Sequence, residues 1–198
     1  MSKTRRFVSR AGDKLEAALA AWPEDIPPID GIIAADLGAN VGGFTDCLLQ
    51  RGAARVYAVE TGYGVLEWKL RQDERVVTME RTNALHAELP ELVDLVVIDG
   101  AWTPQRLILP AALGMLKPSP SGNPAIGHIV TLVKPQYEAH KSELRRGVLP
   151  DEVVPQVLAR VKEDLEQLGG HALREIPSPM RGSGGNTEYL WLIAAKTT

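Results

Sequence analysis

Two lysines and two acidic residues stand where predicted helices and strands begin or end. Asp99 closes the apolar run VDLVVID, Lys134 closes GHIVTLVK, Glu188 opens the final apolar run, and Lys14 lies on a predicted N-terminal helix. Burial and a neighbouring cation favour the uncharged form of an amine, whereas acids favour the charged form. Together the four side chains would titrate as one coupled unit that can take a proton from a hydroxyl. The alternative is a pair of surface salt bridges, each worth about 1 kcal/mol or less.

A glycine-rich turn, DLGANVGGFT, follows the first predicted strand. Such glycines let the backbone approach a ligand closely. The spacing of Gly38, Gly42 and Gly43 departs from the G-x-G-x-x-G of dinucleotide sites, and Phe44 stands where a P-loop has its lysine. Asp36, just before the turn, disfavours a polyphosphate and suits a ligand that carries a positive charge.

A second acidic residue, Glu60, ends the second predicted strand. Its carboxylate could accept hydrogen bonds from the two hydroxyls of a ribose. With Asp36 it indicates a site for S-adenosyl-L-methionine. The alternative is a tight strand-to-helix turn and a surface glutamate.

These residues must be positioned by short apolar runs that alternate with amphipathic stretches. The runs predict strands at 31–37, 54–60, 75–80, 93–99, 127–134, 171–176 and 187–195. Helices are predicted at 13–22, 43–51, 64–71 and 103–116, with a further helix between an Asp151 N-cap and a Gly169 stop, and loops at 118–127 and 177–186. The alternation predicts an α/β fold with a parallel, doubly wound sheet that ends in an antiparallel pair. Ligands bind such sheets at the carboxyl ends of the strands.

Composition narrows the class of protein. The chain has 198 residues, 44% of them hydrophobic, and a net charge of -3, which excludes a uniformly basic nucleic-acid coat. A lone cysteine, Cys47, excludes an internal disulfide and is expected to be a buried core thiol. No metal site is predicted, because the histidines lack ligand spacing: His86, His128, His140 and His171. The sequence has no apolar run of membrane-spanning length and no apolar signal-peptide core, so we expect a cytoplasmic protein with no membrane partner.

Longer motifs carry a family resemblance. VSRAGDKLEAAL, DLGANVGGFTDCLLQRGAARVYAVETGYG, WKLRQD, ERTNA, LVVID, LVKPQ and GNTEYL resemble the TlyA (hemolysin A-like) ribosomal RNA methyltransferases. Lys14, Asp99, Lys134 and Glu188 match, in order, the K-D-K-E of ribose 2′-O-methyltransferases of the FtsJ type. The resemblance runs from about Val8 to the end of the chain.

The resemblance implies a Rossmann-like class I methyltransferase fold with a seven-stranded sheet in the order 3-2-1-4-5-7-6. It implies S-adenosyl-L-methionine as cofactor, bound by Asp36, Gly38, Asn40, Gly42, Gly43, Phe44, Glu60, Asn83 and Asp99. It assigns catalysis to the four K-D-K-E residues; we expect Lys134 to accept the proton and Asp99 to orient it, while Lys14 and Glu188 hold the hydroxyl. The implied partner is RNA, most of all ribosomal RNA, with phosphate contacts from Arg5, Arg6, Arg10, Arg145, Arg146 and Arg181.

Two departures from the family pattern leave alternatives open. Members of the family carry a small RNA-binding module before the VSR motif, whereas this sequence starts almost directly at it. Gly100-Ala101-Trp102-Thr103 replaces a Val-Ser-Phe-like segment after Asp99. We predict a basic arm, helix and connector at 1–29 and a methyltransferase domain at 30–198. The alternative function is a catalytically silent, cofactor-binding RNA or ribosome-assembly factor; a nicotinamide oxidoreductase is disfavoured by the glycine spacing. The sequence does not indicate the oligomeric state.

Overall fold

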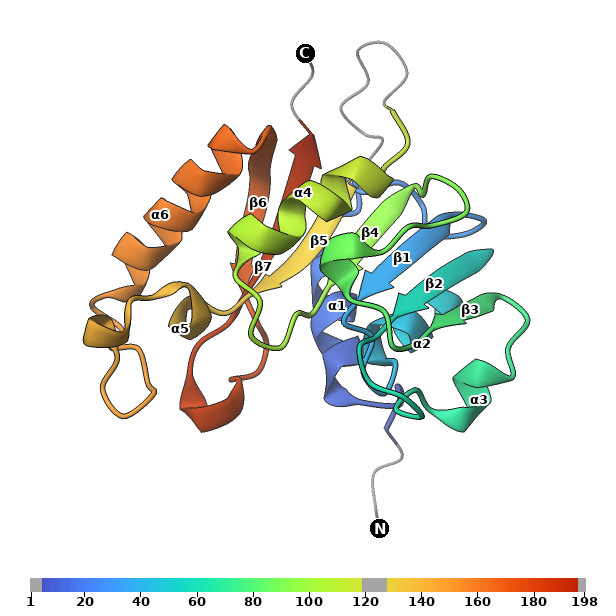
Figure 1. Ribbon diagram of the computed structural model, residues 1–198, viewed down its shortest axis with the longest axis horizontal. Helices are drawn as coiled ribbons and strands as arrows, with labels where there is room; N and C mark the ends of the chain where they lie inside the picture. The colour runs from blue at the N-terminus through green and yellow to red at the C-terminus, as the bar shows by residue number, and fades with distance from the viewer. Residues whose placement is uncertain (1–4, 119–127, 196–198) are drawn as a thin grey trace.

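The computed structural model describes residues 5–118 and 128–195, which form a twisted sheet with helices on both faces (Figure 1). The strands are β1 Ile33–Leu37, β2 Arg55–Val59, β3 Val76–Met79, β4 Leu95–Ile98, β5 His128–Val133, β6 Gly170–Pro177 and β7 Tyr189–Ala195. Their order in the sheet is β3-β2-β1-β4-β5-β7-β6. The first five strands are parallel, and β7 is antiparallel to both β5 and β6. The predicted sheet and its strand order are confirmed.

Helices cover the two faces in separate groups. The helices are α1 Arg10–Ala21, α2 Gly43–Gln50, α3 Trp68–Arg71, α4 Gln105–Met115, α5 Pro135–Glu138 and α6 Val154–Gln167, with short 3-10 turns η1 Ala84–His86, η2 Lys141–Glu143 and η3 Ser183–Gly185. Buried residues of α1 and α2 pack with one face of β1, β4 and β5, and those of α4 and α6 pack with the other. Both faces of the central strands are therefore dry, which explains why β4 and β5 are buried along their whole length and read as nearly continuous apolar runs.

Helices α1 and α3 differ from their predicted extents near their first turns. Helix α1 begins three residues before the predicted start, because Ser9 is its N-cap and the Ser9 hydroxyl accepts a hydrogen bond from the Ala11 N–H at 3.2 Å. Helix α3 has four residues instead of the predicted 64–71. Gly64 adopts a left-handed φ of 71°, which a helix cannot contain, so the segment before Trp68 is a loop.

The prediction that Asp151 caps the α6 helix is wrong. The N-cap is Val153, which has no side-chain hydrogen bond, and the helix begins at Val154 with Pro155 in its first turn. Proline is favoured there because its missing N–H is one that a first turn leaves unpaired. Gly169 ends the helix as predicted, with a φ of 83° directly after the Leu168 C-cap.

The first described residues are held against α1 and α2 by hydrogen bonds and ion pairs. The Val8 N–H donates to Asp46 Oδ2 at 2.8 Å, and Glu16 of α1 pairs with both Arg6 and Arg51. Cys47 lies on α2 and is fully buried, as predicted for a core thiol. Helix α1 thus shares one core with the sheet, while the division at residue 29 stays a prediction. The predicted loop at 118–127 lies outside the described residues, apart from its first.

Candidate active site

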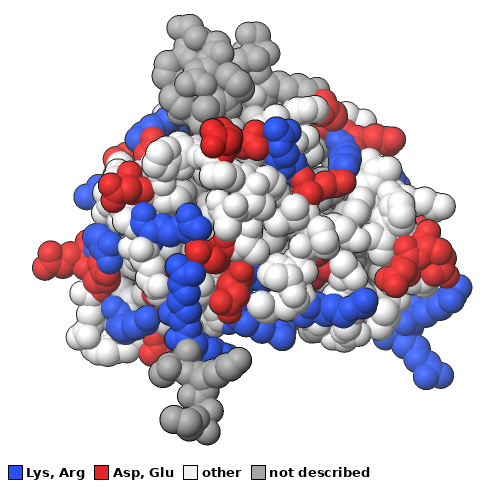
Figure 2. All heavy atoms as spheres, turned by 180° about the vertical axis from the view of Figure 1, so that it is seen from behind, with Lys and Arg blue, Asp and Glu red and all other residues white. Residues whose placement is uncertain are grey.

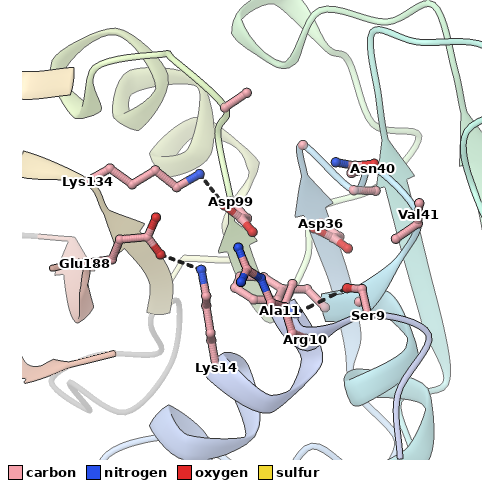
Figure 3. Close-up of a pocket in the computed structure, with 15 residues that line it drawn as sticks. Ser9, Arg10, Ala11, Lys14, Asp36, Asn40, Val41, Asp99, Lys134 and Glu188 are labelled. Carbon is pink, nitrogen blue, oxygen red and sulfur yellow. Dashed lines mark hydrogen bonds and ion pairs between the residues drawn. The ribbon is translucent and has the colours of Figure 1, made fainter. Parts of the chain in front are cut away.

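Two ion pairs lie at the carboxyl edge of the parallel strands (Figure 3). Lys134 Nζ lies 2.7 Å from Asp99 Oδ1 and donates to the Gly100 carbonyl at 2.9 Å. Lys14 Nζ pairs with Glu188 Oε2. The side chains of the first pair are 13% and 22% exposed and those of the second 7% and 4%, so neither is a surface salt bridge. The structure thus brings together all four predicted K-D-K-E residues.

The sheet topology explains this convergence. Asp99 and Lys134 follow the last residues of β4 and β5, which are parallel neighbours, so both side chains emerge at one edge. Because β7 is antiparallel to β5, its start lies beside the end of β5, with Tyr189 opposite Val133. Glu188 precedes β7 and therefore reaches the same edge, where Lys14 approaches from the buried side of α1.

A cavity of about 290 Å³ lies between the two ion pairs and the glycine-rich turn. The turn contributes Asp36, Gly38, Asn40, Gly43 and Phe44 to its lining. The start of α1 contributes Ser9, Arg10 and Ala11, of which sequence reasoning had assigned only Arg10, and as a phosphate contact. An N-cap serine ahead of an amphipathic run is the signal that could have revealed this wall of the site.

The three glycines of the turn do different work. Gly38 has a φ of 88°, and a Cβ there would lie 2.8 Å from the Asp99 carbonyl oxygen. A Cβ on Gly43 would collide with the Ser9 hydroxyl, so this glycine lets α1 close over the turn. Gly42 has a φ of 96° and packs under the turn against Leu66 and Leu70, where it lines neither this cavity nor the next. Its predicted contact with a cofactor has no support in this geometry.

Asp36 is fully buried at the floor of the cavity. Its Oδ2 accepts hydrogen bonds from the Thr45 N–H at 2.9 Å and from the Thr45 hydroxyl at 2.7 Å. Burial, together with the charges of Asp99 and Glu60, raises the pKa of Asp36 to about 7. Its Oδ1 is buried without a hydrogen-bond partner among the described residues. A buried acceptor of this kind is well suited to a ligand that donates a hydrogen bond or carries a positive charge.

A second cavity, of about 430 Å³, adjoins the first at Gly38, Asn40, Asp99 and Ala101. Glu60 lines it and accepts hydrogen bonds from the Asn40 N–H at 2.8 Å and the Gly62 N–H at 2.7 Å. The backbone thus fixes the carboxylate at the mouth of the cavity.

Asn83 and Trp102 lie on other walls of this second cavity. The Asn83 side-chain oxygen accepts from the Leu85 N–H at 3.0 Å, which fixes its orientation. The Trp102 side chain is largely exposed, so the segment that departs from the family pattern forms an open rim. Adjoining cavities with Asp36 in one and Glu60 in the other suit an elongated ligand with a positively charged end and a sugar.

The arginines predicted to meet phosphates are all exposed. Figure 2 shows Lys and Arg side chains gathered along the lower edge of the molecule, and Figure 1 shows that the parallel strands run toward this edge. Three of the predicted arginines also have contacts within the protein: Arg6 with Glu16, Arg145 with Glu152 at 3.5 Å, and Arg181 with the Gly185 carbonyl at 2.8 Å. The remaining three are Arg5, Arg10 and Arg146, and Arg10 also lines the first cavity.

Neither a metal-binding cluster nor a membrane-spanning helix is present in the described part of the chain. Residues 5–118 and 128–195 contain no cluster of three metal-ligating His, Cys, Asp or Glu side chains. Over the same ranges, every helix is too short or too polar to cross a bilayer.

Comparison with known proteins places this site in a family. The model of the FtsJ-like methyltransferases matches residues 7–194. The chain belongs to the FtsJ-like methyltransferase family. Within it, this FtsJ-like chain is 41% identical over 197 residues to the 16S/23S rRNA (cytidine-2′-O)-methyltransferase TlyA of Mycobacterium tuberculosis, covering 95% of this chain and 69% of that protein. It is 39% identical over 191 residues to YqxC of Bacillus subtilis, an rRNA methyltransferase candidate, covering 93% of this chain and 64% of YqxC.

A solved structure agrees with both sequence matches. A hemolysin candidate from Streptococcus thermophilus superposes with a TM-score of 0.90 at 36% identity, covering 100% of this FtsJ-like chain and 70% of that one. The chain spans about two thirds of the length of the curated relatives it matches first.

Proposed function

We propose that this FtsJ-like protein transfers a methyl group from S-adenosyl-L-methionine to a ribose 2′-hydroxyl of RNA, with ribosomal RNA as the substrate. The observation that carries the proposal is the convergence of two Lys–acid pairs, one buried and one partly buried, on a cavity that the glycine-rich turn also lines. The relatives named as rRNA methyltransferases support ribosomal RNA as the substrate. With ribosomal RNA as its substrate, the protein would act in the cytoplasm.

The cofactor would occupy the two adjoining cavities. Asp36 would face its positively charged end, Glu60 would accept from its ribose, and Asn83 would border its base. Gly38 and Asn40, shared by both cavities, would lie against its middle. When bound, S-adenosyl-L-methionine supplies an activated methyl group and leaves as a neutral thioether.

The protein's own residues would align and deprotonate the nucleophile. A ribose hydroxyl attacks poorly unless a base removes its proton. Lys134, in its uncharged form, would take that proton on Nζ, while Asp99 and the Gly100 carbonyl hold the amine in place at 2.7 and 2.9 Å. Lys14 and Glu188 would orient the hydroxyl from the opposite side. Removal of the proton would leave the hydroxyl oxygen free to accept the activated methyl group.

The test is methyl transfer from tritiated S-adenosyl-L-methionine to ribosomal RNA, free and in subunits, followed by mapping of ribose methyls. Lys134→Ala is expected to lower turnover by about 10²- to 10⁴-fold while leaving cofactor affinity unchanged. The matched control is Lys117→Ala. Lys117 pairs with Asp94 at 2.8 Å, at the opposite end of β4. The Lys117→Ala substitution therefore removes a Lys–Asp ion pair that lies away from the site. Near-normal turnover in Lys134→Ala would refute the assignment.

The same experiment separates the alternative of a silent RNA-binding or assembly factor. Such a factor would bind the cofactor and RNA but show no transfer, in the wild type or in Lys134→Ala. Its RNA binding would still weaken steeply with salt, because phosphate contacts release counterions.

A further inference from the structure

Glu138 is a partly buried carboxylate that the proposed chemistry does not use. It is the last residue of α5, the short helix that begins directly after Lys134. Its Oε1 accepts a hydrogen bond from the Gln105 N–H at 2.9 Å. Gln105 is the first residue of α4, the helix that follows the Asp99–Pro104 loop. Glu138 therefore joins the segment that carries one catalytic candidate to the segment that carries its partner.

The start of α4 needs this contact. Its own N-cap residue is Pro104, which offers no side-chain hydrogen bond. The first N–H groups of a helix lack partners within it, and a carboxylate placed there is stabilised by the helix dipole. Glu138 thus caps α4 from another helix, in the place of a local serine or aspartate.

A second cross-link runs parallel to the first. The Gln105 side-chain oxygen accepts from the Thr131 hydroxyl at 2.9 Å, and both side chains are buried. Together with Lys134 Nζ on Asp99 and the Gly100 carbonyl, three sets of bonds join the 99–105 segment to the 131–138 segment. Their geometry fixes the loop after β4 against the end of β5.

We propose that Glu138 is a positioning residue, which caps α4 and so holds the Asp99 loop at the distance that keeps Asp99 on Lys134. This inference rests on the proposed function for its effect on turnover, but its effect on Lys134 can be measured without turnover. A displacement of about 1 Å at a reacting group can cost about 100-fold in rate.

The charge environment of Glu138 makes the contact sensitive to pH. Burial raises the pKa of Glu138 to about 7, and the charge of Asp164 on α6 acts in the same direction. The Gln105 N–H and the charge of Arg106, both on α4, oppose it. The carboxylate form caps the helix better than the neutral acid, so the hold on α4 tightens as pH rises through about 7.

The test compares Glu138→Ala, Glu138→Gln and Glu143→Ala in the full chain. Glu143 is the matched control, because it pairs with Arg160 of α6 at 2.7 Å and its hydrogen bonds come from Arg160 and the His140 N–H, not from α4. We expect Glu138→Ala to lower kcat by about 10- to 100-fold with little change in the KM for the cofactor. Glu138→Gln, whose amide oxygen can still accept from Gln105, is expected to restore most of that loss. The ratio of the wild-type rate to the Glu138→Gln rate should rise by about two- to fivefold between pH 6 and 8.

Labelling of lysines with trace acetic anhydride gives a readout that is independent of turnover. The reactivity of Lys134 relative to Lys117 is expected to rise in Glu138→Ala and stay at the wild-type value in Glu143→Ala. If the two variants show this labelling pattern but the wild-type protein transfers no methyl group, the proposed function fails and the positioning role stands.

Three outcomes would overturn the positioning role. The first is unchanged kcat and unchanged labelling in Glu138→Ala, and the second is an equal loss in Glu143→Ala. The third is a ratio of the wild-type rate to the Glu138→Gln rate that stays constant between pH 6 and 8. This third outcome decides the question if Glu138→Ala does not fold.

Discussion

The buried pair between Lys14 and Glu188 allows a sharp test of how α1 is fastened to the sheet. Replacing Lys14 by Met keeps an unbranched chain of similar length but leaves the Glu188 carboxylate without its cation. With side chains only 7% and 4% exposed, water cannot replace the lost partner. Breaking such a pair costs about 3–5 kcal/mol in the free energy of unfolding.

An exposed pair of the same chemistry provides the comparison. Lys162 and Glu175 lie 2.8 Å apart with side chains 44% and 45% exposed. Lys162→Met is therefore expected to cost about 1 kcal/mol or less. At roughly 2–4 °C per kcal/mol for a chain of this length, Lys14→Met should lower the Tm by roughly 6–20 °C and Lys162→Met by a few degrees at most.

Urea unfolding at pH 7.5, followed by circular dichroism, measures both variants. Lys14→Met/Glu188→Met should regain much of the loss, because removing both charges leaves no uncompensated ion. The reasoning is refuted if Lys14→Met costs no more than Lys162→Met, or if the double variant is as unstable as the sum of its single changes.

Three further predictions concern the turn and the core. Gly38→Ala should abolish cofactor affinity in calorimetry, because its Cβ would press on the Asp99 carbonyl at 2.8 Å; Gly64→Ala, also at positive φ but in open space, should retain it. Equal losses in both would contradict this reading. The pKa of Asp36 is raised to about 7, so the folded state holds that proton more tightly than the unfolded state, and stability falls as pH rises from about 4 to 7. Asp36→Asn should flatten this slope in urea unfolding, and an unchanged slope would rule out the effect of burial. Burial raises the pKa of the Cys47 thiol, so a disulfide reagent should label it only at the rate of opening, and rapid labelling of folded protein would contradict its place in the core.

The sheet could be predicted from the sequence because helices cover both faces of its central strands. The runs that became β1, β4 and β5 needed no long-range information, since burial on two sides demands apolar residues throughout. Helix boundaries that depend on a single capping hydrogen bond were harder to predict. Helix α1 begins at a Ser9 cap followed by Gly12, a weak helix former, and this hid its first turn.

The pairing at the site lay beyond the sequence. Lys14 and Glu188 are 174 positions apart, and only the position of β7 beside β5 brings them together. Which lysine pairs with which acid, and how deeply each pair is buried, depends on side-chain packing that has no local signature. The wall of the cavity at Ala11 was missed for the same reason, since it exists only because Gly43 admits α1.

The position of β7 has a consequence for the order of folding. This last strand of the sequence is an interior strand of the sheet, inserted between β5 and β6. Until β7 has been synthesised, β5 presents an open, mostly apolar edge and β6 lacks the strand it pairs with, which is a state prone to aggregation. Glu188 arrives with the same strand, so a chain that stops short of β7 lacks both its closed sheet and its second ion pair. Completion of the fold and completion of the site are therefore a single late event.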